Sequence, residues 1–136
     1  MKVIFDTNVL MAAFLTEGLC SRILLRANRG DFDLYISSSI IREFEEALRI
    51  KAGFSRRESG AIISLVNEIV QLAEPKENDK RKAHGLCRDE TDDHVLACAL
   101  ACNADYLVTG DKDLLEVKRL HHLTVISPRE FELLFD

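Results

Sequence analysis

The sequence predicts an α/β fold in which a central parallel sheet of about five strands lies between two layers of helices. Short apolar runs alternate with segments of helical periodicity along all 136 residues. The apolar runs are continuous rather than alternating, as expected for strands covered on both faces. With 47% hydrophobic residues the chain can form one continuous core, but it is too short for two ordinary domains. Residues 1–136 are therefore expected to form a single domain.

The first half of the chain is expected to begin with a strand and then to alternate between helices and strands. The predicted strands are Lys2–Phe5 and residues 34–36, and a further short strand fits residues 70–73. Helices are predicted over residues 9–15, 21–28, 40–50 and 62–70. Their boundaries are indicated by the stop signal Gly30, by three serines at 37–39 and by the capping box from Ser55 to Glu58.

In the second half, residues 75–88 are rich in charge and poor in apolar side chains, so we expect a long loop there. The acidic residues 89–92 are typical of a helix start, and the Ala- and Leu-rich residues 95–102 favour the helix itself. Strands are predicted over residues 106–109 and 124–126. A second capping box, from Ser127 to Glu130 with Pro128 at the first helical position, predicts a final helix.

Acidic side chains recur where one element gives way to the next. They are Asp6, Glu43, the pair Asp92 and Asp93, and Asp111. Acids at strand ends and neighbouring helix starts of one parallel sheet converge on a single cleft. Several carboxylates close together cannot all stay ionised without a positive charge among them, so the pattern predicts a bound divalent metal.

The order and spacing of four segments resemble the PIN-domain ribonucleases. They are Asp-Thr-Asn-Val-Leu at 6–10, Glu43, Asp-His-Val-Leu-Ala-Cys-Ala at 93–99 and Ala-Asp-Tyr-Leu-Val-Thr-Gly-Asp at 104–111. The resemblance covers essentially the whole chain, and it is greatest to the compact proteins of the VapC-like toxin type. It implies a three-layer α/β/α PIN-like domain that hydrolyses RNA to leave a 5′-phosphate and a 3′-hydroxyl.

The resemblance also implies roles for individual residues. Hard oxygen ligands suit Mg²⁺ or Mn²⁺, which would hold a phosphate and activate a water for in-line attack. The implied catalytic and metal-binding residues are Asp6, Glu43, Asp93 and Asp111. Asp93 is preferred over Asp92 because the family pattern is an acid, two residues, and then Leu/Ile-Ala-x-Ala. The residues that could form an outer shell are Asn8, Asp92, Thr109 and Asp113.

The formal net charge of −5 would normally count against a nucleic-acid partner, but carboxylates that bind metal leave a surface closer to neutral. A local basic cluster could then contact the RNA backbone, although a solvated loop is the default interpretation. It consists of Lys76, Lys80, Arg81, Lys82 and Arg88. Beyond RNA, the expected partners are an antitoxin protein that caps the cleft and a second copy in a homodimer. No segment suggests export or membrane insertion, so a cytoplasmic protein is expected.

Other interpretations remain open at this level. A housekeeping RNA-processing nuclease would carry the same acids, and a non-catalytic PIN module could bind RNA or protein. An aspartyl-phosphate phosphatase needs a second Asp two positions after Asp6, where this chain has Asn8. Zinc bound by Cys98, Cys102, His84 and Cys87 is disfavoured, because Cys98 and Cys102 share an apolar helix face. Without a secretory segment, the four cysteines are expected to be reduced thiols.

Overall fold

The computed structural model describes residues 1–135, and Asp136, the last residue of the expected domain, lies outside them. Its centre is a six-stranded sheet in the order β3-β2-β1-β4-β6-β5. All neighbouring strands run parallel except β5, which pairs antiparallel with β6. The strands are β1 (Lys2–Phe5), β2 (Asp33–Ile36), β3 (Gln71–Leu72), β4 (Tyr106–Val108), β5 (Arg119–Leu120) and β6 (Leu123–Ile126).

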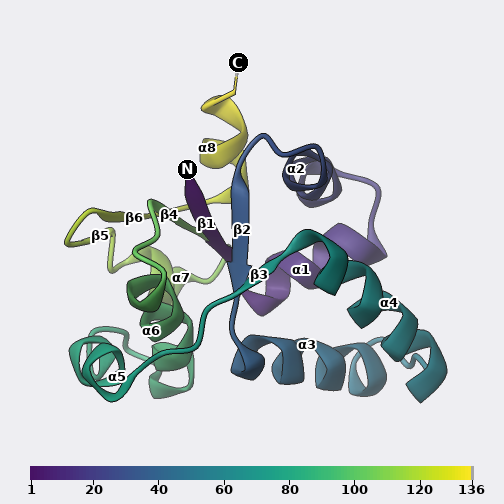
Figure 1. Ribbon diagram of the computed structural model, residues 1–136, viewed down its shortest axis with the longest axis horizontal. Coiled ribbons are helices and arrows are strands. Elements are labelled where there is room, and N and C mark those ends of the chain that lie inside the picture. Colours follow the sequence, from purple (N-terminus) through teal and green to yellow (C-terminus); the bar gives the residue numbers. More distant parts are fainter. Residues whose placement is uncertain (136) are drawn as a thin grey trace.

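Helices cover both faces of this sheet, which confirms the predicted three-layer α/β/α arrangement. Figure 1 shows α1, α2 and α4 on one side of β1 and β2, and α5 and α6 on the other. The helices are α1 (Thr7–Leu15), α2 (Leu19–Asn28), α3 (Ser38–Ile50), α4 (Arg56–Ile69), α5 (Glu77–Ala83), α6 (Asp93–Ala101), α7 (Lys112–Leu115) and α8 (Pro128–Leu133), with a 3₁₀ turn η1 (Glu90–Asp92) before α6.

The five predicted strands are all present, and the helix boundaries follow the capping signals. Ser55 and Glu58 form the expected reciprocal capping box at the start of α4, with bonds of 2.9 and 3.1 Å. Ser127 and Glu130 do the same at the start of α8, where Pro128 is the first helical residue. These side chains satisfy backbone N–H groups that have no partner within the helix.

Two elements differ from the sequence-based expectation. Residues 75–88 do not form one long loop, because they contain helix α5. That helix has Glu77 and Asp79 in its first turn and three basic residues in its last, the distribution that complements the helix dipole. It packs on α6 through the fully buried Ala83. The short edge strand β5, which was not expected, returns antiparallel beside β6.

The core is continuous from the sheet to the C-terminal helix. Phe131 of α8 is fully buried, and its ring meets those of Phe32 and Phe135 edge to face at centroid distances of 5.0 and 5.3 Å. Burial of such a ring contributes about 1.5–3 kcal/mol, so α8 is an integral part of the fold.

Among residues 1–135 no single helix is long and apolar enough to span a membrane. Helices α1 and α2 reach the required length and composition only together, across a bend of 98°.

Candidate active site

The register of β1 and β4 places Asp6 beside Thr109. Phe5 is paired with Val108, and the Asp6 N–H donates to the Val108 carbonyl at 3.2 Å. The residues that follow these strands therefore lie next to each other at the carboxyl edge of the sheet, where open α/β folds bind ligands. The Thr109 hydroxyl donates to Asp6 Oδ2, and Asp6 Oδ1 accepts from the Val9 N–H at 2.9 Å. Asp6 is thus the N-cap of α1, and it lies buried at the carboxyl edge of the sheet.

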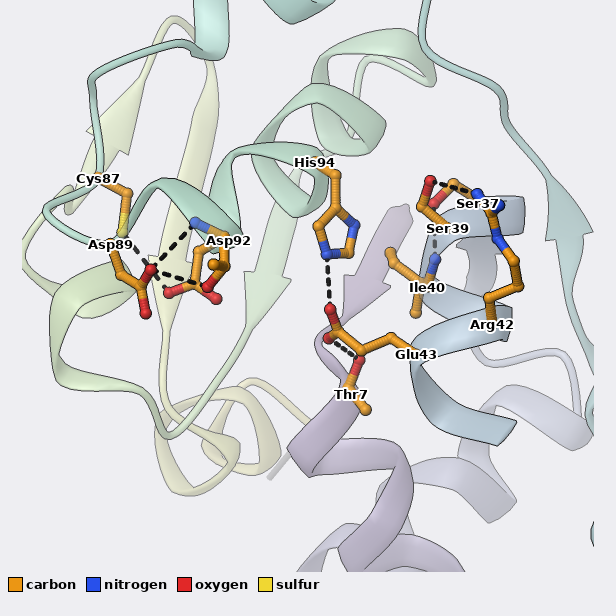
Figure 2. A network of polar contacts seen from close by, with 11 residues as sticks. Thr7, Ser37, Ser39, Ile40, Arg42, Glu43, Cys87, Asp89, Asp92 and His94 are labelled. Carbon is orange, nitrogen blue, oxygen red and sulfur yellow. Dashed lines mark hydrogen bonds and ion pairs between the residues drawn. The ribbon is translucent and has the colours of Figure 1, made fainter. Parts of the chain in front are cut away.

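Glu43 reaches the same edge from the second turn of α3. Helix α3 begins directly after β2, because Ser37 caps it by accepting from the Ile40 N–H at 3.2 Å. The two carboxylate oxygens of Glu43 have separate partners: the Thr7 hydroxyl donates to Oε1 at 2.5 Å, and His94 Nε2 lies 2.9 Å from Oε2. Figure 2 shows the Glu43 carboxylate held between these two side chains, which come from α1 and α6.

Asp92 and Asp93 face different regions, and only Asp92 lines the cleft. Asp92, at the end of η1, lines the cleft that contains Asp6 and Glu43. Asp93, the first residue of α6, instead lines a neighbouring hollow, where its Oδ2 lies 3.3 Å from His84 Nδ1. Successive residues of a helical turn point about 100° apart, which is consistent with these two adjacent acids facing different hollows.

Asp111 joins the cleft from the segment after β4. It caps α7 by accepting from the Asp113 N–H at 2.8 Å, and its own N–H donates to the Thr109 hydroxyl at 3.0 Å. Thr109 therefore connects Asp6 and Asp111, as a secondary hydrogen-bonding group would. Of the other expected outer residues, Asn8 lines the cleft, whereas Asp113 is not among the residues that line it.

These side chains enclose one open cleft of about 320 Å³. Four chain segments contribute to it, and most of its charged groups are acids. The acids that line it are Asp6, Glu43, Glu46, Asp92 and Asp111. The remaining lining residues are Thr7, Asn8, Ala47, Ile50, Lys51, Thr91 and Val95.

The electrostatics of the cleft follow from burial and from mutual repulsion of the acids. Burial raises the pKa of Asp6 above its ordinary value, and the charges of Asp111 and Glu43 raise it further against the opposing hydrogen bonds. Burial, followed by the charges of Asp111 and other acids, raises the pKa of Asp92 to about 6. The pKa of Glu43 is lowered, chiefly by its hydrogen bond with His94.

The donor set fits a hard divalent cation in its chemistry. Asp6, Glu43 and Asp111 of the expected set, together with Asp92, place carboxylate oxygens on one cleft, and such oxygens suit Mg²⁺ or Mn²⁺. Within residues 1–135, however, no three His, Cys, Asp or Glu side chains are already arranged to hold a metal ion. The carboxylates would have to draw together around a bound ion.

The expected RNA-binding basic residues do not line this cleft. Lys80 lines the neighbouring hollow that contains Asp93, and Lys82 lines a third hollow beside α6. Arg88 is exposed and lies 3.8 Å from Glu116. Lys76 and Arg81, on or next to α5, are exposed. The basic residue that does line the cleft is Lys51, which follows α3 and was not among the expected contacts.

Sequence reasoning also missed Thr7 and His94 as partners of Glu43. Each adjoins a motif residue, next to Asp6 and Asp93 respectively, but only the packing of α1, α3 and α6 shows that they meet.

The zinc interpretation does not fit the structure. Cys98 is fully buried, and its thiol donates to the Ala73 carbonyl at 3.6 Å. Burial raises the pKa of Cys98 to about 12 and that of Cys102 to about 11, which disfavours the thiolates that zinc requires. All four cysteines are free thiols.

Comparison with known proteins agrees with the fold. Residues 2–113 match the family model of the PIN domain. The chain therefore belongs to the PIN-domain family. A search of curated proteins gave no match.

Solved structures share the fold at low sequence identity. The crystal structure of VapBC2 from Rickettsia felis, bound to a promoter DNA fragment, aligns with a TM-score of 0.69 and 17% identity over 93% of this chain and 98% of that one. VapBC-1 from nontypeable Haemophilus influenzae gives a TM-score of 0.71 and 16% identity over 95% and 99%. Mycobacterium tuberculosis VapC20, described as a toxin that cleaves the sarcin-ricin loop, gives 0.59 and 12% over 82% and 91%.

Proposed function

We propose that this PIN-domain protein is a metal-dependent endoribonuclease. The observation that carries the proposal is the convergence of Asp6, Glu43, Asp92 and Asp111, from four chain segments, on one open cleft at the carboxyl edge of the sheet. The sequence motifs selected Asp93 for the third of these roles, and we now assign it to Asp92 on the basis of the cleft geometry.

The chain's own residues would position the reactants. Asp6 and Asp111, connected through Thr109, and Asp92 would hold a divalent cation. Glu43, fixed on both oxygens by Thr7 and His94, would complete this ligand set or orient the attacking water. A bound Mg²⁺ or Mn²⁺ supplies the positive charge that activates water for in-line attack on a phosphodiester. No protein nucleophile is required.

Two measurements test this proposal together. The purified chain should cleave single-stranded RNA oligonucleotides in Mg²⁺ or Mn²⁺ and lose this activity in chelator. The Asp6→Asn variant should lose at least about 100-fold in kcat/KM, the usual cost of removing a central electrostatic group. Undiminished cleavage by Asp6→Asn would instead indicate a contaminating nuclease, and cleavage by neither protein would favour a non-catalytic PIN module.

Metal should also stabilise the folded chain, because it relieves carboxylate repulsion that exists only in the folded state. At a metal concentration 100 times Kd the gain is about 2.7 kcal/mol. A thermal melt with and without metal measures this gain, and Asp6→Asn should remove most of it. An unchanged gain in Asp6→Asn would place the metal elsewhere.

We further propose that the protein is the toxin of a toxin–antitoxin pair in the cytoplasm, with an antitoxin that caps the cleft. The shared fold and similar length of the VapBC structures support this role. Co-purification from the native host tests it: a small protein partner that inhibits cleavage is expected, whereas a free, constitutively active chain would favour a housekeeping RNA-processing nuclease. Size measurement of the free chain tests the expected homodimer.

A further inference from the structure

The end of α3 forms one wall of the acidic cleft and contributes an exposed apolar side chain and a basic side chain to its lining. Ile50, the last residue of the helix, lines the cleft although 72% of it is exposed. Lys51, the next residue, is the one basic residue that the described part of the chain contributes to the lining.

Lys51 has the charge that an RNA strand needs at this position. A phosphodiester that approaches the cleft meets five lining carboxylates, which repel it. Across residues 1–135 the ammonium group of Lys51 forms no ion pair with a carboxylate, so it is available to an incoming phosphate.

The backbone that carries these two side chains is fixed. The Lys51 N–H completes the last turn of α3 by donating to the Ala47 carbonyl at 2.9 Å. Gly53, with φ of 75°, then reverses the chain in the left-handed conformation that glycine tolerates best. The Phe54 N–H returns to the Leu48 carbonyl at 3.0 Å, and the Phe54 side chain packs against the core.

We propose that Lys51 and Ile50 form a nucleotide subsite beside the acids, in which Lys51 binds a phosphate flanking the scissile one and Ile50 packs on the attached ribose or base. An apolar contact with a base face requires an unstacked base, so the substrate class is single-stranded RNA. The inference rests on the proposed ribonuclease function and names a substrate-positioning element for it.

A purely structural role for the two residues has to be separated from this one. A lysine at the end of a helix also interacts favourably with the helix dipole, and a single exposed isoleucine needs no special explanation. Arg49 provides the matched control, because it lies on the last turn of α3, is exposed and does not line the cleft.

Binding of a phosphorothioate-linked single-stranded RNA, which resists cleavage, can be followed by fluorescence anisotropy in Mg²⁺ at several KCl concentrations. Lys51→Ala should weaken binding about 10-fold, the effect of losing one charge-assisted hydrogen bond. The slope of log K against log salt should become shallower by about 0.7, the counterion contribution of one single-strand phosphate. Lys51→Arg should retain the slope. Ile50→Ser should weaken binding but leave the slope unchanged.

Equal changes in Lys51→Ala and Arg49→Ala would overturn the subsite, because only general surface charge would then be involved. Lys51→Ala that lowers the melting temperature and leaves RNA affinity unchanged would reduce the residue to a helix-capping role. Lys51-dependent binding by a chain that cleaves no RNA would retain the subsite and reject the nuclease function. Failure of the wild-type chain to bind RNA would reject both.

Discussion

Two hollows lie on either side of the Glu43–His94 pair, and they differ in how their acids are compensated. The acidic cleft is lined by Glu43 and four other acids, and Lys51 is the basic residue among its described lining. The neighbouring hollow, of about 500 Å³, contains His94 and a mixture of both charges. Its charged and ionisable residues are Arg42, Glu74, Lys80, His84, Glu90, Asp93 and His94.

The difference is clearest for the two neighbouring acids, one in each hollow. In the second hollow Asp93 Oδ2 lies 3.3 Å from His84 Nδ1. In the cleft, Asp92 has the Cys87 thiol at 3.9 Å and otherwise faces other acids, and its pKa is raised to about 6. Two neighbouring residues of the same type thus have different electrostatic surroundings.

The most severe test of the comparison replaces each of the two neighbouring acids in turn. Asp92→Asn should lower kcat/KM for RNA cleavage by about 100-fold or more, because it removes a carboxylate of the charged cleft. Asp93→Asn should change it by less than about 5-fold, since a charge outside the cleft contributes little. Parallel steady-state assays in Mn²⁺ measure both. Equal losses, or the reverse order, would restore the assignment made from the sequence motif.

A smaller effect is expected from His94, which connects the two hollows. Its imidazole contacts Glu43 but does not line the cleft. His94→Ala should reduce metal affinity or kcat/KM by about 10-fold, as is usual when the partner of a ligand is removed. A metal titration followed by the melting temperature gives the affinity. His94→Asn or His94→Gln, which could keep a hydrogen bond to Glu43, should recover part of the loss, whereas an effect on stability alone would argue for a packing role.

The stability of the metal-free chain should depend on pH through Asp92. The folded pKa of Asp92, about 6, exceeds its ordinary value of 3.8, so the folded chain binds this proton more tightly than the unfolded chain. Asp92 therefore costs stability progressively as pH rises from about 4 to about 6. In chelator, the melting temperature of Asp92→Asn should exceed that of the wild type by about 3 °C above pH 6 and by less at pH 4.

The predictable parts of this protein depend on local sequence, and the parts that were missed depend on contacts between distant elements. Buried strands such as Lys2–Phe5 and capping boxes such as that of Ser55 are visible in short windows. Helix α5 was missed because its sequence has no apolar residues at helical spacing, and the buried residue that packs it on the core is Ala83. Its N-cap is Lys76, a residue type that gives no capping signal.

The sequence identifies the acid pair Asp92 and Asp93 but not which of the two lines the cleft, and it does not show that Lys51 reaches the cleft. A sequence pattern identifies an acid pair at a helix start, but the turn η1 decides which member faces the cleft. Lys51 reaches the cleft only because α3 packs beside α1 and ends there. Neither fact is encoded within a short window of sequence.

The smallest expected effect concerns the second hollow itself. His84→Ala removes the partner of Asp93, but the His84 side chain is 72% exposed, so the pair should contribute less than about 1 kcal/mol to the free energy of unfolding. Urea unfolding measures this change, and RNA cleavage should stay within about 3-fold of the wild type. The same variant therefore separates a surface ion pair from an extension of the active site. If His84→Ala lowered cleavage as much as Asp92→Asn, the two hollows would act as one, and compensation of charge would no longer distinguish them.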